Sequence, residues 1–313
     1  MKVLITGGAG FIGSHVAEHF IKQQQDVYIV DNLSSGYRAN IPFIDDNHFF
    51  HTDIRNYDEI ESIIRTHQFD IIIHLAAVVS VVDTVENPEE SNDVNISALV
   101  HLLELCRKYL NHLKKFIFAS SAAVYGNEAT LPKSILSPIQ PESPYAIQKY
   151  SSEQYVKLYH ALYHLPTTSL RFFNVYGPKQ DPQSQYSGVL SIMKNCFDHD
   201  KTFTFFGDGE QTRDFVYVKD IVQAVQVVLE QHSSDGQVYN VGTSQPTSLL
   251  AIYKTFVNLY QKEIPVAFAA PRDGDVKHSY ADIEPLKQLG FLNRYTLQEG
   301  LDEYLKFEMS HQS

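Results

Sequence analysis

The first half of the chain alternates short apolar runs with longer stretches in which apolar residues recur at helical spacing. The short runs are rich in β-branched and aromatic residues, which predicts buried strands at 2–6, 27–30, 48–51, 71–75, 116–119 and 168–172. Amphipathic stretches at 13–24, 56–66, 91–110 and 144–164 predict helices between them. This order is typical of βαβ units, so we predict an α/β protein with a doubly wound parallel sheet of the Rossmann type.

The alternation weakens after Pro178, where glycine and proline divide the chain into shorter pieces typical of a smaller α+β domain. The stretch from Phe215 to Val241 is an exception, because its predicted helix at 220–231 and strand at 238–241 look as if they return to the first domain. We therefore expect a Rossmann domain of residues 1–175 with 214–242, and a substrate-binding domain of residues 176–213 and 243–313.

Composition and charge narrow the choice of partners. The net charge of −12 repels nucleic acid and anionic membrane surfaces. Cys106 and Cys196 are too few and too far apart for a disulfide framework or a metal knuckle, and they suit a reducing compartment. The apolar run at the amino terminus ends at glycines, and no later apolar segment has the length of a membrane span. We expect a soluble, cytoplasmic protein.

A glycine-rich turn joins the first predicted strand to the first predicted helix. Its sequence is Gly-Gly-Ala-Gly-Phe-Ile-Gly at 7–13, and glycines at this place let the main chain approach a pyrophosphate. Asp31 follows the second strand, where a carboxylate accepts hydrogen bonds from the adenosine ribose and repels a 2′-phosphate. These residues predict NAD rather than NADP, with Arg38 as the one feature that favours the alternative.

Candidate chemistry follows the fifth strand. Ser121 stands at its end, and Tyr145 and Lys149 lie four residues apart near the start of the helix at 144–164, so they share a helical face. The pKa of a tyrosine is ordinarily about 10, and a lysine one turn away favours the phenolate. We predict that Tyr145 acts as a base, that Lys149 tunes it, and that Ser121 holds the reacting hydroxyl.

Further motifs occur in a fixed order along the whole chain. They are Asp-Asn-Leu-Ser-Ser-Gly at 31–36, Asp-Ile-Arg at 53–55, His-Leu-Ala-Ala at 74–77, Ser-Ser-Ala-Ala-Val-Tyr-Gly at 120–126, Pro-Tyr-Ala-Ile-Gln-Lys at 144–149, Arg-Phe-Phe-Asn-Val-Tyr-Gly-Pro at 171–178, Gly-Asp-Gly-Glu-Gln-Thr-Arg-Asp-Phe at 207–215 and Arg-Asp-Gly-Asp-Val at 272–276. With the glycine turn, they resemble the extended short-chain dehydrogenases and, within them, the nucleotide-sugar 4-epimerases.

The resemblance implies two sets of binding residues. For NAD they are Gly7, Gly10, Phe11, Ile12, Gly13, Asp31, Asn32, Ser34, Ser35, Gly36, Asp53, Ile54, Leu75, Ala76, Ala77, Asn95, Tyr145, Lys149 and Phe173. For the substrate they are Ser80, Ser121, Tyr145, Asn174, Gly188, Val189, Thr204, Phe206, Arg213, Arg272, Asp275 and Ser279. Asn174, Arg213 and Arg272 would hold the diphosphate, and Asn95 would support the catalytic residues.

The resemblance also implies a reaction. Tyr145 would take the proton from the sugar 4-hydroxyl while hydride leaves C4 for the nicotinamide, and hydride return to the other face of the 4-keto sugar would give the C4 epimer. Related dehydratases and decarboxylases carry a carboxylate just after the catalytic serine or threonine, whereas this chain has Ala122 and Ala123. Simple epimerisation is therefore the expected activity.

Three positions bear on the sugar and the cofactor. Members restricted to unacetylated hexoses tend to carry a tyrosine where this chain has Ser279, so we expect room for an N-acetyl group. The segment Gln180-Asp181-Pro182, followed by Tyr186 and Gly188, also resembles UDP-N-acetylglucosamine 4-epimerases. Val79 replaces a lysine found near the nicotinamide in some hexose epimerases, so one cofactor contact is absent.

These observations give one expectation and leave alternatives open. We expect an NAD-dependent enzyme that interconverts UDP-N-acetylglucosamine and UDP-N-acetylgalactosamine, and a homodimer paired through the helices at 91–110 and 144–164 as in the resembling family. UDP-glucose and UDP-galactose, or UDP-glucuronate, are alternative substrates. A non-catalytic NAD-sensing protein on the same fold is a more remote alternative. The histidine pairs at 15 and 19 and at 160 and 164 lack a third metal ligand.

Overall fold

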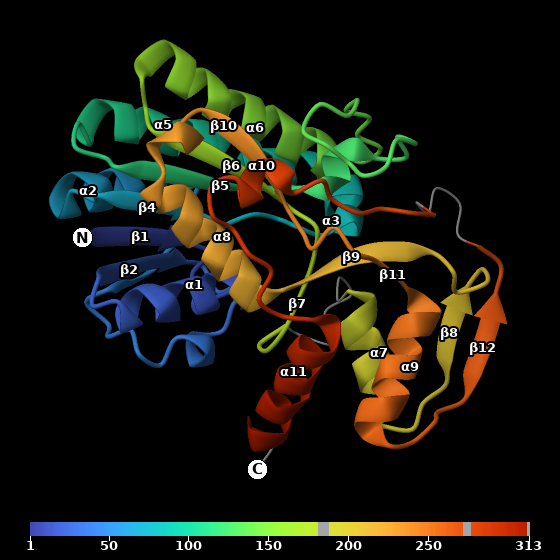
Figure 1. Ribbon diagram of the computed structural model, residues 1–313. Helices are drawn as coiled ribbons and strands as arrows, with labels where there is room; N and C mark the ends of the chain where they lie inside the picture. Colours follow the sequence, from blue (N-terminus) through green and yellow to red (C-terminus); the bar gives the residue numbers. More distant parts are fainter. Residues whose placement is uncertain (181–187, 272–276, 312–313) are drawn as a thin grey trace.

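A seven-stranded parallel sheet forms the centre of the computed structural model, which describes residues 1–180, 188–271 and 277–311 (Figure 1). Its order is β10-β6-β5-β4-β1-β2-β3. The strands are β1 (Lys2–Thr6), β2 (Asp26–Asp31), β3 (Phe49–His51), β4 (Ile71–His74), β5 (Lys115–Ser121), β6 (Thr167–Phe172) and β10 (Gln237–Val241). The doubly wound sheet predicted from the sequence is confirmed, and each predicted strand of the first half is present with its ends shifted by two residues at most.

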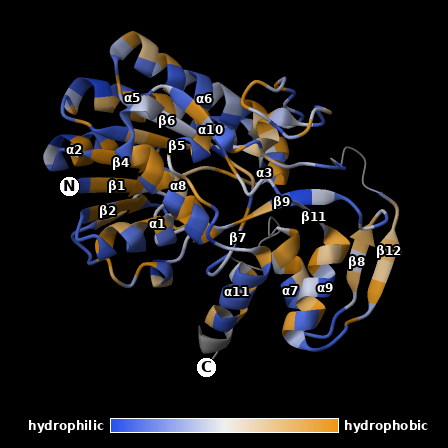
Figure 2. Ribbon diagram, in the orientation of Figure 1, coloured by the Kyte–Doolittle hydropathy of each residue, from blue (hydrophilic) through white to orange (hydrophobic). Residues whose placement is uncertain are grey.

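Helices cover both faces of this sheet. Helices α1 (Phe11–Lys22) and α8 (Val218–Glu230) pack on one face, and α2 (Tyr57–His67), α5 (Ala98–Tyr109) and α6 (Pro144–Tyr163) pack on the other. Successive residues of one strand therefore enter different cores: Ile5 packs toward α1, whereas Leu4 packs toward α2 and α5. This double burial explains why the strands read as continuous apolar runs, which Figure 2 shows in orange.

The helix expected at 91–110 is interrupted. It consists of α4 (Pro88–Asn92), a π-helical turn (Asp93–Ser97) and α5. Within the turn, the main-chain oxygen of Asn95 accepts from Ser152 Oγ of α6 at 2.6 Å, a partner from outside the helix. Such π turns are rare and often occur at functional sites.

The second half builds a smaller layer beside the sheet. Its strands are β7 (Asn174–Tyr176), β9 (Thr212–Tyr217) and β11 (Pro246–Ser248), which form one sheet, and β8 (Phe203–Phe206) and β12 (Val266–Ala269), which form another. Its helices are α7 (Val189–Asp198), α9 (Leu249–Tyr260) and α11 (Leu297–His311), with the short α10 (Glu284–Lys287) under the central sheet. Strand β9 joins the two halves, because Val216 packs with the core of α1 and α8 while Phe215 and Tyr217 pack with the second core.

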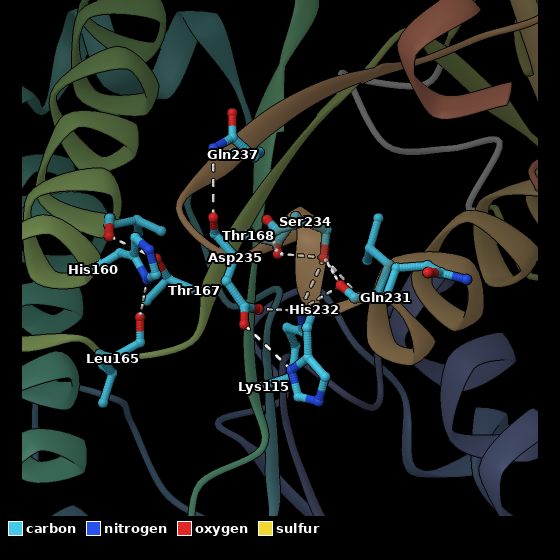
Figure 3. A network of polar contacts seen from close by, with 12 residues as sticks. Lys115, His160, Leu165, Thr167, Thr168, Gln231, His232, Ser234, Asp235 and Gln237 are labelled. Atoms are coloured by element: carbon cyan, nitrogen blue, oxygen red, sulfur yellow. Dashed lines mark hydrogen bonds and ion pairs between the residues drawn. The ribbon is translucent and has the colours of Figure 1, made fainter. Parts of the chain in front are cut away.

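A buried lysine fixes the last strand of the central sheet (Figure 3). Lys115, at the start of β5, donates to Ser234 Oγ at 2.9 Å, to Gln231 O at 3.2 Å and to the carboxylate of Asp235. Thr168 Oγ1 in β6 donates to Ser234 O at 2.8 Å. The connection between α8 and β10 is thereby held against the amino ends of β5 and β6. The domain boundaries expected from the sequence stay a prediction.

The described residues contain no helix that is both long enough and apolar enough to cross a membrane.

Candidate active site

The glycine turn lies where β1 ends and α1 begins. Gly7 has a left-handed φ of +71°, and a Cβ there would lie 2.7 Å from Ala76 N. A Cβ on Gly13 would lie 2.2 Å from Gly7 O. A Cβ on Gly10, in contrast, would meet one atom within 4 Å, Gly7 O at 3.3 Å. Gly7 and Gly13 therefore serve the packing of the turn, while Gly10 is half-buried and less closely surrounded.

The residues around the turn fit an adenosine ribose and a pyrophosphate. No side chain caps the amino end of α1, so its first amides are available to an anion. Asp31 is almost buried, and its carboxylate accepts from Ala9 N at 2.9 Å and from Leu33 N at 2.8 Å. Arg38 donates to Ile41 O at 2.7 Å and pairs with Asp46 at 3.2 Å, so its guanidinium is occupied within its own loop.

The other predicted cofactor residues surround the ends of β2, β3 and β4. Asn32 Nδ2 donates to Asp53 at 2.8 Å, and the paired guanidinium of Arg55 lowers the pKa of Asp53 to about 2. Phe11 and Ile12 open α1, Ser34, Ser35 and Gly36 lie in the loop after β2, Ile54 follows β3, Leu75, Ala76 and Ala77 follow β4, and Phe173 follows β6. Because the carboxyl ends of parallel strands share one edge, these residues gather at that edge of the sheet.

Ser121, Tyr145 and Lys149 meet at the end of β5. Ser121 caps a 3-10 turn (Ala122–Tyr125), where its Oγ accepts from Ala123 N at 3.2 Å, and its hydroxyl also lowers the pKa of Tyr145. Lys149 Nζ donates to Ala119 O at 2.9 Å and lies 5.9 Å from the centre of the Tyr145 ring. The structure therefore brings the three predicted catalytic side chains together.

The pKa values of Tyr145 and Lys149 are shifted mainly by burial, an effect that the sequence argument did not include. Burial raises the pKa of Tyr145 above its usual value, although the hydrogen bond with Ser121 acts in the opposite direction. Burial also lowers the pKa of Lys149 to about 8. The sequence argument considered the charge of the lysine and not the loss of water around both groups, so the predicted stabilisation of the phenolate by Lys149 is not the dominant effect here.

Asn95 braces the loop after β4 against α6. Its Oδ1 accepts from Val78 N and its Nδ2 donates to Val78 O, each at 2.9 Å, and Nδ2 also donates to Gln148 Oε1 at 2.7 Å. Both amide hydrogens of Asn95 are therefore used inside the protein, which fits the predicted supporting role. Its partners Gln148 and Ser152 could not be predicted from the sequence, since each lies far from Asn95 in the chain.

The other predicted sugar and diphosphate residues lie on several elements, most of them in the second half of the chain. Ser80 Oγ caps α3 (Val81–Glu86) by accepting from Asp83 N at 2.8 Å. Asn174 begins β7, Gly188 and Val189 begin α7, and Thr204 and Phe206 lie on β8. Arg213 Nη1 donates to Thr212 O at 3.0 Å, and Ser279 N donates to the same oxygen at 3.2 Å. Arg272 and Asp275, like Asp181, Pro182 and Tyr186, lie outside the described residues.

Asp214 is an additional residue that the sequence did not single out. It is fully buried, and its carboxylate accepts from Thr243 N at 2.7 Å, Thr243 Oγ1 at 2.6 Å, Ser244 N at 3.0 Å and Ala281 N at 3.0 Å. It therefore connects β9, which carries Arg213, with the segment that carries Ser279. A buried carboxylate beside an arginine in a strand is the only signal that could have revealed it.

One histidine of each predicted pair makes a hydrogen bond with a main-chain oxygen. His15 Nε2 lies 2.9 Å from Pro178 O, and His160 Nδ1 lies 2.9 Å from Leu165 O. Within residues 1–180, 188–271 and 277–311, no group of three histidine, cysteine, aspartate or glutamate side chains is placed to hold a metal ion.

Comparisons with known proteins agree with this geometry. A UDP-glucose 4-epimerase of Thermotoga maritima, solved with UDP-glucose, is 36% identical, with a TM-score of 0.93 and 100% of each chain covered. A UDP-N-acetylglucosamine 4-epimerase of Methanobrevibacter ruminantium, solved with UDP-N-acetylmuramic acid, is also 36% identical, with a TM-score of 0.92 over 99% of this chain and 98% of the other.

Curated sequences and a family model extend the comparison. A UDP-glucose 4-epimerase of Mycolicibacterium smegmatis is 33% identical over 312 residues, which cover 98% of each chain. The model of the NAD dependent epimerase/dehydratase family matches residues 3–242, from the first strand of the central sheet to the residue after its last strand. On this evidence, the chain belongs to the NAD dependent epimerase/dehydratase family.

Proposed function

We propose that this protein is a UDP-sugar 4-epimerase and that UDP-N-acetylglucosamine and UDP-N-acetylgalactosamine are its substrates. The observation that carries the proposal is the meeting of Ser121, Tyr145 and Lys149 at the carboxyl end of β5, on the same sheet edge as the glycine turn and Asp31. The similarity to 4-epimerases over the whole chain supports the reaction class.

NAD fits the residues at the sheet edge, because Gly10 has no side chain at the uncapped amino end of α1 and Asp31 is fixed by two amides where the ribose hydroxyls are expected. When bound, NAD supplies the hydride acceptor and donor for C4 of the sugar. Gly7, Gly10 and Gly13 would form the floor of the pyrophosphate site, and Asp31 would bind the ribose and repel a 2′-phosphate.

Tyr145 moves the proton in this proposal. Its phenolate oxygen takes the proton of the sugar 4-hydroxyl as C4 is oxidised, and returns it to the same oxygen after the 4-keto sugar has turned over. Ser121, which is hydrogen-bonded to Tyr145, orients the 4-oxygen. Lys149, with a pKa of about 8, keeps most of its positive charge at neutral pH, and its Nζ lies 5.9 Å from the centre of the Tyr145 ring.

The residues after Ser121 favour epimerisation over elimination. Ala122 and Ala123 open the 3-10 turn, so they bring no acid or base to the reacting sugar. The small side chain of Ser279 supports the acetylated sugar, because it lies beside β9 on the segment tied to Thr212 O and leaves more room than a tyrosine. Arg213 on β9, with Arg272, would bind the diphosphate.

The proposal is tested with the purified protein, added NAD and three separate substrates: UDP-N-acetylglucosamine, UDP-glucose and UDP-glucuronate. Chromatography resolves the 4-epimers. We expect UDP-N-acetylglucosamine to be converted at least as fast as the others. Ser279→Tyr should slow that conversion by about tenfold or more and spare UDP-glucose, since one pocket position changes discrimination by about 1–3 kcal/mol. Ser279→Ala, which keeps a small side chain, is the control. Conversion of an unacetylated sugar alone would overturn the assignment of the acetylated substrate.

The same assay separates an enzyme from an NAD-sensing protein. Tyr145→Phe removes the proton acceptor and should lower turnover by about 10²–10⁴-fold while NAD binding, followed by calorimetry, stays close to that of the wild type. If Tyr145→Phe instead epimerises as fast as the wild type, Tyr145 is not the base.

We also propose that the protein is a homodimer. Helix α6 exposes Ile147, Tyr155, Leu158 and Leu162, whose side chains are between 41% and 63% exposed in one chain. An apolar face of this kind favours burial against another surface. Light scattering coupled to size-exclusion chromatography should give twice the mass of one chain, and Leu158→Glu should shift the protein toward a monomer.

A further inference from the structure

The segment that carries Ser279 is held by its main chain on both sides. Ser279 N donates to Thr212 O at 3.2 Å, Lys133 N donates to Tyr280 O at 2.8 Å, and Asp282 N donates to Lys133 O at 2.7 Å. The residue between them, Ala281, donates to Asp214 and accepts from Ser244 Oγ at 2.6 Å. These bonds leave the segment 279–282 little freedom to shift by itself.

A buried polar chain starts from the same segment. Lys133 O, which accepts from Asp282, also accepts from Asn240 Nδ2 at 2.7 Å. Asn240 Oδ1 accepts from Tyr125 Oη at 2.7 Å, and Tyr125 Oη accepts from Arg171 Nη1 at 2.8 Å. Tyr125 and Asn240 are 1% and 2% exposed, so water does not compete for these bonds.

This series of polar contacts ends on α6, the helix that carries Tyr145 and Lys149. Arg171 forms a two-pronged ion pair with Glu153 of α6, with Nε to Oε2 at 2.8 Å and Nη2 to Oε1 at 2.6 Å. Glu153 also accepts from Ser120 Oγ at 2.8 Å. Glu153 lies one helical turn after Lys149, and Ser120 precedes Ser121, so the polar chain reaches the neighbours of two proposed catalytic residues.

Each hydrogen bond in this polar series determines which atom donates in the next. An arginine can only donate, so Tyr125 Oη accepts from Arg171 and must give its single proton to Asn240 Oδ1. Asn240 is then oriented with Nδ2 toward Lys133 O. A buried ion pair such as Arg171–Glu153 adds little net stability, and its best-attested use is to set one register between packed elements.

We propose that Tyr125 is a positioning residue that sets the register between the segment 279–282, which lines the sugar pocket, and helix α6, which carries Tyr145. The proposal rests on the proposed function, since it gives the sugar pocket to this segment. Tyr125 touches neither sugar nor cofactor in this scheme. Its hydroxyl is the link that joins the ion pair on α6 to Asn240 and, through Lys133, to the pocket.

The test replaces one hydroxyl and keeps the ring. Tyr125→Phe should lower kcat by about tenfold or more and change the ratio of UDP-N-acetylglucosamine to UDP-glucose turnover, because the sugar is no longer held in register with Tyr145. NAD binding should stay close to that of the wild type. Tyr28→Phe is the matched control: Tyr28 is also buried, its hydroxyl donates to Asp26 at 3.3 Å, and it lies on β2 outside the polar chain. We expect its kcat and substrate ratio to be those of the wild type.

A purely structural role gives a different result. It would lower the melting temperature and the fraction of folded protein, while kcat per bound NAD and the substrate ratio would stay unchanged, and that result overturns the proposal. If Tyr125→Phe does not fold, Asn240→Asp provides the second test, because it keeps the acceptor for Tyr125 and removes the donor to Lys133. Failure of the proposed function is distinguishable, since the wild type itself would then convert none of the UDP-sugars.

Discussion

Two glycines of the turn between β1 and α1 play different parts although they look equivalent in the sequence. Gly13 lies inside α1, where alanine is favoured over glycine by about 1 kcal/mol. Its Cβ would lie 2.2 Å from the main-chain oxygen of Gly7, an atom that cannot move aside cheaply. Gly10 precedes the helix with an ordinary φ of −74°, and its Cβ would lie 3.3 Å from Gly7 O, which is a tight contact but a much milder one than at Gly13.

The two alanine variants should therefore separate folding from cofactor binding. We expect Gly13→Ala to lower the free energy of unfolding by about 1–3 kcal/mol, because the clash exceeds the gain in helix propensity. Gly10→Ala should lose less stability than Gly13→Ala, because its Cβ would lie 3.3 Å and not 2.2 Å from Gly7 O. It should bind NAD about tenfold more weakly or worse, since the new methyl group would occupy the approach of the pyrophosphate. Urea unfolding and calorimetric titration measure the two effects. Wild-type NAD affinity in Gly10→Ala would contradict this placement of the cofactor.

Local spacing was enough to predict some residues of the site and insufficient for others. Ser121, Tyr145 and Lys149 could be predicted because a strand end and one helical turn determine their relation. The rise in the pKa of Tyr145 could not, since it depends on burial by residues from other parts of the chain. The partners of Asp214 are separated from it by 29 to 67 residues, so no local pattern reveals them.

At the scale of elements, β10 shows how a distant segment is attached to the central sheet. Its strand could be predicted from its apolar pattern, but Lys115, which fixes the preceding connection, stands at the start of a buried strand and carries no signal of its partners. The side chain of Lys115 is 1% exposed and that of Asp235 is 17% exposed, so this ion pair is largely shielded from water.

Lys115→Met should therefore destabilise the fold without affecting the chemistry. We expect the free energy of unfolding to fall by about 3 kcal/mol, because the substitution leaves the carboxylate of Asp235 without its cation. Turnover should be unchanged, since Lys115 lies at the end of β5 opposite Ser121. Lys114→Met is the matched control, because Lys114 is 55% exposed and its ion pair with Asp70 spans 3.2 Å at the surface. Equal stabilities of the two variants would contradict the argument.

The interrupted helix and the sheet partners of β9 could not be predicted from the hydrophobic pattern along the chain. The π turn at Asn95 depends on a hydroxyl from α6, and helical periodicity does not register such a contact. Strand β9 alternates residues between two cores, which makes it resemble any strand buried on both faces. Its sheet partners, β7 and β11, lie far from it in the sequence, so their pairing emerges only in the folded molecule.

For the whole molecule, one buried and one half-buried histidine predict a loss of stability in acid. His74 is 2% exposed, and burial, followed by the charge of Lys149, lowers its pKa to about 3. Burial likewise lowers the pKa of His15 to about 4. Each group binds a proton more readily in the unfolded chain, where its pKa is near 6.5, so the stability it contributes is complete above pH 6.5 and declines as the pH falls toward the folded value.

Asp220 acts in the opposite direction, because burial raises its pKa to about 6 and favours the folded state as the pH falls. At about 1.4 kcal/mol per pKa unit, the two histidines together cost about 4 kcal/mol between pH 7 and pH 5, and Asp220 offsets about 1 kcal/mol of that. For these three groups together, we expect urea unfolding to show that the free energy of unfolding decreases by about 2–3 kcal/mol between pH 7 and pH 5. His74→Asn should remove about 2 kcal/mol of the decrease, whereas His232→Asn, at a side chain that is 92% exposed, should leave it unchanged. A wild-type pH dependence in His74→Asn would show that His74 is protonated in the folded protein, and its 2.7 Å contact with Thr6 Oγ1 would then have to be a hydrogen bond from the imidazolium.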